Sequence, residues 1–183
     1  MALRDKDTTA RRAAAEALGK IGDRSAVKPL IRVLFFHDFQ ARRKAAKSLA
    51  QLGDPAAAIP LARTLDSWDP KLRKISGQAI VQMGDVRPVP LLIRYLHSWK
   101  SVTREEAAIV LGGLKDQRAV EPLVRAFRRE GNPITSHAML TAAKSLGARL
   151  DTSWEQMDLR RMYEYDQVQE QKRKELNSKK KLQ

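Results

Sequence analysis

The feature that most constrains this chain is an aspartate that returns every 31 residues within a recurring pattern. The four positions are Asp23, Asp54, Asp85 and Asp116. A glycine precedes the first three, and Lys115 takes its place in the fourth. A period of this length is typical of solenoids, whose units bury their apolar faces only by stacking on one another. We therefore expect a row of similar units.

Each unit is predicted to be two helices joined by a tight turn. In the first unit, apolar residues from Ala14 to Ile21 follow the i, i+3, i+4, i+7 spacing of one helix face. Gly22 suits the left-handed conformation that ends a helix, and Asp23 can cap the helix that follows. Lys115 should cost about 1 kcal/mol if it adopts the same conformation. We call the first helix of each unit helix A and the second helix B.

The regular spacing ends after Arg129, where residues 130–133 fit a four-residue insertion. Residues 142–151 then echo residues 45–54, which predicts a degenerate fifth unit whose helix B begins near Ser153. An apolar stripe is expected to close that last layer, at Trp154, Met157, Met162, Tyr165 and Val168. The predicted units are 7–37, 38–68, 69–99, 100–134 and 135–168, followed by a basic, partly disordered tail at 169–183.

The repeat register also bears on the first residues of the chain. Leu3 stands one period before Leu34, which would place it at the end of a preceding unit. We therefore expect either a longer array that continues beyond this face or a partner docked on it, because end units of solenoids normally need a polar cap.

Composition narrows the partners and the compartment. The chain has 35 Lys and Arg against 21 Asp and Glu, a net charge of +14, which favours acidic partners. It has no cysteine, which excludes disulfides and thiolate sites. It lacks both the run of about 20 apolar residues that a bilayer crossing needs and the pattern of a secretory signal peptide. We expect a cytoplasmic protein, with the nucleus as the alternative.

The unit RRAAAEALGKIGDRSAVKPLIRVL, residues 11–34, resembles short HEAT repeats of the kind found in phycobilisome lyases. The resemblance covers roughly residues 7–129 and extends more weakly to about 168. It implies an all-α fold, a right-handed α-α superhelix of four regular helical-hairpin repeats plus the degenerate fifth. It also implies binding of other macromolecules, since the family includes protein scaffolds, lyases and DNA-binding relatives of glycosylases.

Arginine also recurs every 31 residues, once on each helix. On helix A the positions are Arg11, Arg42, Arg73 and Arg104, for which we expect surface or packing roles. On helix B they are Arg32, Arg63, Arg94 and Arg125. We expect the helix B arginines to form a structural ladder with the four turn aspartates, bonding each layer to the next. The alternative is that both columns line a phosphate-binding groove.

Residues that do not recur are the better candidates for partner binding. On or near helix B they are Arg24, Lys28, Arg87, Arg118, Arg128 and Arg129, joined by Tyr95 and His97. The alternative for these bases is a solvated helix face. Trp68 and Trp99 stand 31 residues apart between units, where they either bind a partner by stacking or pack between layers. The tail adds electrostatic candidates at Lys172, Arg173, Lys174, Lys179, Lys180 and Lys181.

No motif predicts catalysis, a metal or a cofactor. The three histidines, His37, His97 and His137, lie in different units without the spacing of a helical metal site. The sequence therefore favours a non-enzymatic scaffold or adaptor that binds an acidic partner protein through the helix B surface. The alternatives are a nucleic-acid-binding HEAT protein, which would contact phosphates through the bases and the tail, and a lyase-like accessory factor.

Overall fold

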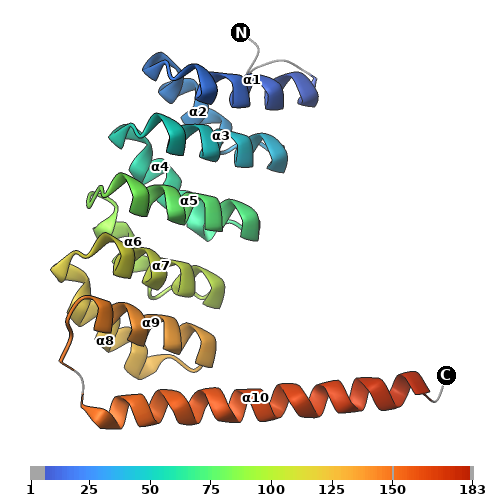
Figure 1. The fold of residues 1–183 in the computed structure, drawn as a ribbon, viewed down its shortest axis with the longest axis vertical. Helices are drawn as coiled ribbons and strands as arrows, with labels where there is room; N and C mark the ends of the chain where they lie inside the picture. Colours follow the sequence, from blue (N-terminus) through green and yellow to red (C-terminus); the bar gives the residue numbers. More distant parts are fainter. Residues whose placement is uncertain (1–6, 150, 182–183) are drawn as a thin grey trace.

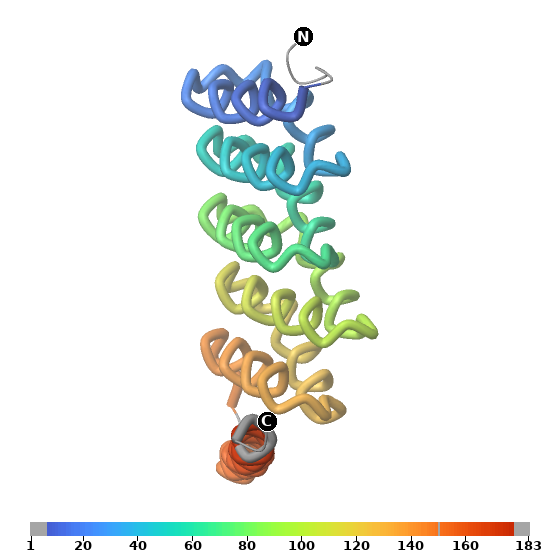
Figure 2. The backbone as a smooth tube through the Cα atoms, turned by 90° about the vertical axis from the view of Figure 1, so that its right-hand side faces the viewer, coloured from blue at the N-terminus to red at the C-terminus, as the bar shows by residue number. Residues whose placement is uncertain are grey.

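The computed structural model describes residues 7–149 and 151–181, and their side chains as far as Asn177. Helices stack in two parallel columns, as Figures 1 and 2 show, so the prediction of an all-α solenoid is confirmed. The helices A are α1 (Thr8–Ile21), α3 (Phe39–Leu52), α5 (Pro70–Met83), α7 (Ser101–Leu114) and α9 (Pro133–Ser145). The helices B are α2 (Val27–Val33), α4 (Ala58–Arg63), α6 (Val89–Tyr95) and α8 (Val120–Arg129), and α10 (Thr152–Lys181) follows α9.

The turn between the two helices of a unit forms as the sequence predicts. Gly22 adopts the left-handed conformation with φ 77°, and Asp23 accepts a hydrogen bond from the amide of Ser25 to cap a short 3₁₀ helix at Arg24–Ala26. In the fourth unit Lys115 takes the glycine's place with φ 54°, the only positive φ among the non-glycine residues that the structure describes.

The core lies between the two columns and repeats with the sequence. Leu30, Leu61, Leu92 and Leu123 occupy the same position of helix B in four units, and all are fully buried. On helix A, Leu49 is fully buried, whereas Leu18 at the same position of the first unit is only half-buried. The difference arises because no described unit lies beyond α1.

The fifth unit departs from the prediction in two ways. Helix α9 begins at Pro133, one residue later than the 31-residue spacing requires, so most of the extra residues lie between α9 and α10. The prediction of a four-residue insertion at 130–133 was therefore wrong.

The apolar stripe predicted for α10 is also wrong in part. Trp154 does stack on Phe127, with ring centroids 5.3 Å apart, but Met157 and Val168 are 45% and 50% exposed. The packed face instead includes a carboxylate, because Asp158 is only 4% exposed and its Oδ2 lies 2.7 Å from His137 Nδ1.

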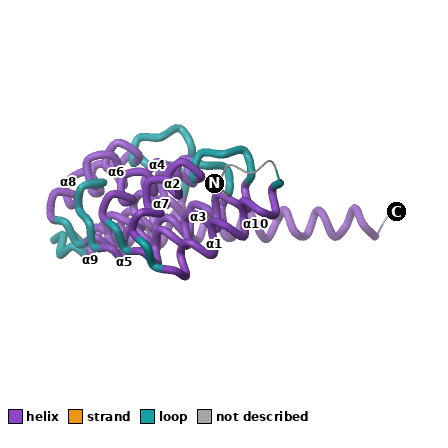
Figure 3. The backbone as a smooth tube through the Cα atoms, turned by 90° about the horizontal axis from the view of Figure 1, so that it is seen from above, coloured by secondary structure: helices purple, strands orange, loops and turns teal. Residues whose placement is uncertain are grey.

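Helix α10 continues past the stack to Lys181, as Figures 1 and 3 show. The sequence had suggested a partly disordered tail from residue 169. The continued helix is supported by ion pairs one turn apart, such as Lys174 with Glu170 and Arg160 with Glu164. Leu3 and the end unit expected there lie outside the described residues.

Candidate partner-binding surface

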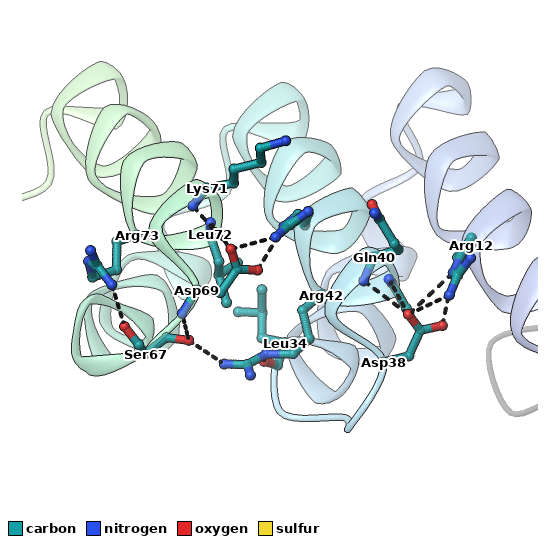
Figure 4. Close-up of polar contacts among 12 residues, drawn as sticks. Arg12, Leu34, Asp38, Gln40, Arg42, Ser67, Asp69, Lys71, Leu72 and Arg73 are labelled. Carbon is teal, nitrogen blue, oxygen red and sulfur yellow. Dashed lines mark hydrogen bonds and ion pairs between the residues drawn. The ribbon is translucent and has the colours of Figure 1, made fainter. Parts of the chain in front are cut away.

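Arginines of helix A tie each layer to the next along one edge of the stack. Arg12 Nε donates to both carboxylate oxygens of Asp38, at 3.0 and 3.2 Å, as seen in Figure 4. Arg43 makes a two-pronged contact with Asp69, with both distances at 2.7 Å. Each of these aspartates also caps the helix A of its own layer, so one carboxylate joins two helices.

The acids of these pairs are strongly held in their ionised form. Burial opposes ionisation of Asp69, but hydrogen bonds from Arg43 and from the amides of Leu72 and Lys71 outweigh it and lower its pKa. The pKa of Asp38 is lowered in the same way.

A third pair joins α7 to the loop after α8. Arg104 Nε lies 2.6 Å from Glu130 Oε2, and a second contact from the same guanidinium measures 2.8 Å. Burial again opposes ionisation, but the hydrogen bond from Arg104 prevails and the pKa of Glu130 is lowered.

The helix A arginine column predicted from the sequence has a packing role. Arg42 Nε donates to the carbonyl of Leu34 at 2.7 Å, and Arg73 donates to the carbonyl of Ser67 at 2.8 Å. Both carbonyls belong to the segment before helix A, so these guanidinium groups fix the connection between units.

The ladder predicted between the helix B arginines and the turn aspartates does not form. Asp23 and Arg32 stand at opposite ends of helix B, nine residues apart, which amounts to about 13 Å along a helix. Asp23, Asp54 and Asp116 cap the 3₁₀ helices of their own turns. Asp85 accepts a hydrogen bond from the amide of Arg87, and two of the four bind arginines of the same turn, Asp85 with Arg87 and Asp116 with Arg118. They are therefore occupied within their own layer.

The helix B arginines face solvent instead. Arg32, Arg63 and Arg94 lie in the last turns of α2, α4 and α6, all exposed, and none forms an ion pair with a residue that the structure describes. Arg125 is paired with Glu121, one turn earlier, at 2.8 Å. We call Arg32, Arg63 and Arg94 the unpaired arginine column.

The neighbours of this column differ from layer to layer. One turn earlier on each helix stand Lys28, Ile59 and Pro90, all exposed. The surface around the column is therefore both basic and apolar, without a carboxylate at this position until Glu121 in the fourth unit.

The other predicted partner-binding residues have different contacts in the structure. Arg87 and Arg118 are engaged by their turn aspartates, as described above. Arg128 covers the Trp154 ring at 4.6 Å. His97 and Arg129 line a hollow of about 380 Å³ beside Glu130.

The remaining predicted bases are exposed, and Tyr95 is half-buried. Arg24 and Lys28 lie in solvent near the start of the stack. Burial raises the pKa of Tyr95, Asp66 adds to the rise, and Arg63 and Arg94 oppose it. Tyr95 follows Arg94 directly at the end of α6.

Trp68, at the end of the second unit, and Trp99, at the end of the third, form an exposed pair. Their ring centroids lie 5.7 Å apart with the planes inclined at 63°. The side chains remain 68% and 78% exposed, so the alternative of packing between layers is wrong. Lys100 Nζ lies 4.6 Å from the centre of the Trp68 ring and 5.4 Å from that of Trp99.

Three of the six predicted tail bases have side chains that the structure describes. Lys172, Arg173 and Lys174 are exposed on α10. The side chains of residues 179–181 lie outside the described residues.

Over the part of the chain that the structure describes, no group of three His, Cys, Asp or Glu side chains is placed to hold a metal ion. In the same residues no helix combines the length and the apolar character needed to cross a membrane.

The repeat geometry agrees with comparison to known families. The family model for HEAT repeats matches residues 1–80 and 60–144. The chain belongs to the HEAT-repeat family. HEAT repeats generally mediate protein interactions. No curated protein matches the chain.

Solved structures with a similar fold come from unrelated settings. An engineered protein has 20% identity and a TM-score of 0.50, with 80% of this chain and 76% of that chain covered. The complex of CpcE and CpcF of phycocyanin lyase from Nostoc sp. PCC7120 has 23% identity, a TM-score of 0.44 and 79% of each chain covered. Human deoxyhypusine hydroxylase in complex with glycerol has 17% identity and a TM-score of 0.41, with 90% of this chain and 82% of that chain covered. At 20% identity the likeness to the engineered protein shows the fold alone.

Proposed function

We infer that this HEAT-repeat protein is a non-enzymatic scaffold that binds an acidic segment of a partner protein along its helix B surface. The observation that carries this proposal is the unpaired arginine column, Arg32, Arg63 and Arg94. Guanidinium groups recognise carboxylates through paired hydrogen bonds, and these three lack a carboxylate partner within the described residues.

The spacing of the column suits an extended chain. Neighbouring layers of packed helices lie about 10 Å apart. A flexible peptide that adopts an extended conformation with three residues per turn covers that distance in about three residues and brings every third side chain to the same face. A segment with Asp or Glu at every third position would therefore offer one carboxylate to each of the three arginines.

Long-range charge supports the same partner. The net charge of +14 attracts an acidic segment before contact, and the effect weakens as salt screens it. The exposed side chains of Ile59 and Pro90 beside the column add apolar contact area that a polyanion without apolar groups would not use.

A fluorescently labelled (Glu-Gly-Ser)6 peptide tests the proposal by anisotropy at low and physiological salt. We expect it to bind the wild-type protein, to bind more weakly as salt rises, and to lose at least tenfold in affinity to R32E/R63E/R94E. The matched control is K47E/K71E/K74E on helices A, which lowers the net charge by the same six units through three exposed lysines. Equal losses of affinity in the two variants would show that only the net charge matters, and they would contradict the assignment of the binding surface to helix B.

Nucleic acid is the competing outcome, because exposed bases on α10 and the helix B column are also suited to phosphates. A labelled oligothymidine of 20 nucleotides serves as the probe. Tighter binding of this strand than of the peptide, with a steep dependence on salt and sensitivity to R32E/R63E/R94E, would replace the protein-binding proposal.

A further inference from the structure

Trp68 and Trp99 are a pair of exposed rings that follow the ends of α4 and α6, near the helix B surface. Tryptophan is enriched among residues that contribute most to binding, since one ring buries about 150–250 Å². Two adjacent rings that are both more than two-thirds exposed point to a contact that the chain alone does not complete.

Lys100 holds these rings in place. Its side chain is only 9% exposed, and its ammonium group donates to the carbonyl of Asp66 at 2.8 Å while lying against both indoles. Asp38 and Asp69 occupy the corresponding position in earlier units, where they form the ties to Arg12 and Arg43. The fourth layer thus replaces that tie with a lysine that fixes two tryptophans, and fixed rings lose less conformational freedom on binding.

The geometry restricts the ligand. The space where a ligand cation would meet both rings is already occupied by the Lys100 ammonium group, which disfavours a methylated lysine or another cation. The inclination of 63° prevents two successive, nearly parallel bases of a nucleic-acid strand from stacking on both rings. A saturated ring or aliphatic side chain, which needs no parallel stacking, can contact the face of one indole and the edge of the other.

The pair adjoins the unpaired arginine column. Arg63 lies in the last turn of α4 and Trp68 follows it by five residues, and Arg94 in the last turn of α6 precedes Trp99 by the same five residues. An apolar anchor and two unpaired cations therefore share one continuous surface.

We propose that Trp68 and Trp99 anchor a proline of an acidic, polyproline II segment whose carboxylates contact Arg63 and Arg94. The polyproline II helix has three residues per turn and a rise of about 3.1 Å, so identical faces recur at about 9 Å, close to the layer spacing. Proline rings stack on indoles and arrive already ordered. This inference names the partner of the surface in the proposed function and rests on it.

The test compares two labelled peptides of the same charge and spacing, (Glu-Pro-Pro)6 and (Glu-Gly-Ser)6. We expect the wild-type protein to bind the proline peptide more tightly. W68A/W99A should lower the affinity for the proline peptide by about 30-fold, the loss typical of a binding hot spot. The affinity for the Gly-Ser peptide should stay within about twofold of the wild-type value. W154F is the matched control, because Trp154 stacks on Phe127 away from this surface, and it should change neither affinity.

The outcomes separate the two proposals. Unchanged binding of the proline peptide by W68A/W99A overturns the anchor while leaving the arginine surface intact. Loss of proline-peptide binding in W68A/W99A without any effect of R32E/R63E/R94E supports the anchor and overturns the acidic-segment function. If W68A/W99A lowers the affinity only for the oligothymidine strand, the tryptophans bind nucleic acid and the inference is wrong.

Lys100 is a positioning residue in this account, and its variants sharpen the test. K100M keeps the aliphatic stem but removes the charge that holds both rings, so tryptophan fluorescence anisotropy should fall and proline-peptide affinity should drop about fivefold. K100R keeps the charge, so the tryptophan fluorescence anisotropy and the proline-peptide affinity should both stay close to the wild-type values. A K100M protein with unchanged ring mobility and affinity would contradict the role of Lys100.

Discussion

Arginines stand on both helices of the repeat, and those that tie one layer to the next have the opposite environment to those of the helix B column. Arg43 on helix A meets the buried carboxylate of Asp69 in the next layer, whereas Arg63 on helix B reaches no carboxylate among the described residues. Arg43 stands next to the recurring helix A column and outside it, whereas Arg63 belongs to the recurring helix B column, so periodicity alone does not decide the role of an arginine. A carboxylate within reach turns a guanidinium into a tie between layers, and its absence leaves a surface that can bind a partner.

The largest effect is expected from R43A. This change leaves the Asp69 carboxylate, whose side chain is 2% exposed, without its charge partner, so the free energy of unfolding should fall by about 2–3 kcal/mol. Urea unfolding followed by circular dichroism measures it. R63A is the matched control and should stay within about 0.5 kcal/mol of wild type. Similar losses in the two variants would erase the distinction between the columns.

Acid should weaken the helix A ties and spare the helix B surface. The pKa of Asp69 in the folded protein lies below its ordinary value of 3.8, so its ionised form stabilises the fold at neutral pH. This stabilisation is lost as the pH falls from about 5 through the lowered pKa. The same sign holds for Asp38 and Glu130.

Urea midpoints between pH 7 and pH 3 measure this dependence. R43A should show a shallower loss of stability with acid than wild type, and R32Q/R63Q/R94Q should follow the wild-type curve. A steeper acid dependence in R43A would contradict the assignment.

The smallest effect is expected at Arg125, the last arginine of the helix B column and the one that has a carboxylate partner. E121Q removes the exposed partner of Arg125 and should cost only about 0.3–0.5 kcal/mol of stability. It also frees a fourth guanidinium, so affinity for (Glu-Gly-Ser)6 should rise by a small factor. A fall in peptide affinity would show that Arg125 does not extend the surface.

The helical stack was predictable because each of its determinants is local. The Gly-Asp turn, the apolar spacing and the capping aspartates act within a few residues, so four regular units and even the left-handed Lys115 follow from the sequence. The fifth unit was less predictable because its echo of residues 45–54 is displaced from the helix positions. Its packed face also includes a polar residue, Asp158, which an apolar pattern cannot indicate.

The partner-binding surface was predicted only in outline. The tryptophans were identified from their position between units, but the sequence analysis did not single out Lys100, which contacts both rings. The arginine ladder was assigned to the helix B column, whereas Arg12 and Arg43, which form the ties, stand next to the helix A column; the 26-residue separation between Arg43 and Asp69 is not the repeat period. A search for opposite charges at that separation would have found the pair.

The central claim is that the helix B arginines are free for a partner and do not support the fold. The most direct measurement is the urea unfolding of R32Q/R63Q/R94Q beside wild type, in the buffer used for peptide binding. We expect the unfolding free energy to change by less than about 1 kcal/mol while affinity for (Glu-Gly-Ser)6 falls at least tenfold. A loss of several kcal/mol, or unchanged peptide binding, would contradict the account.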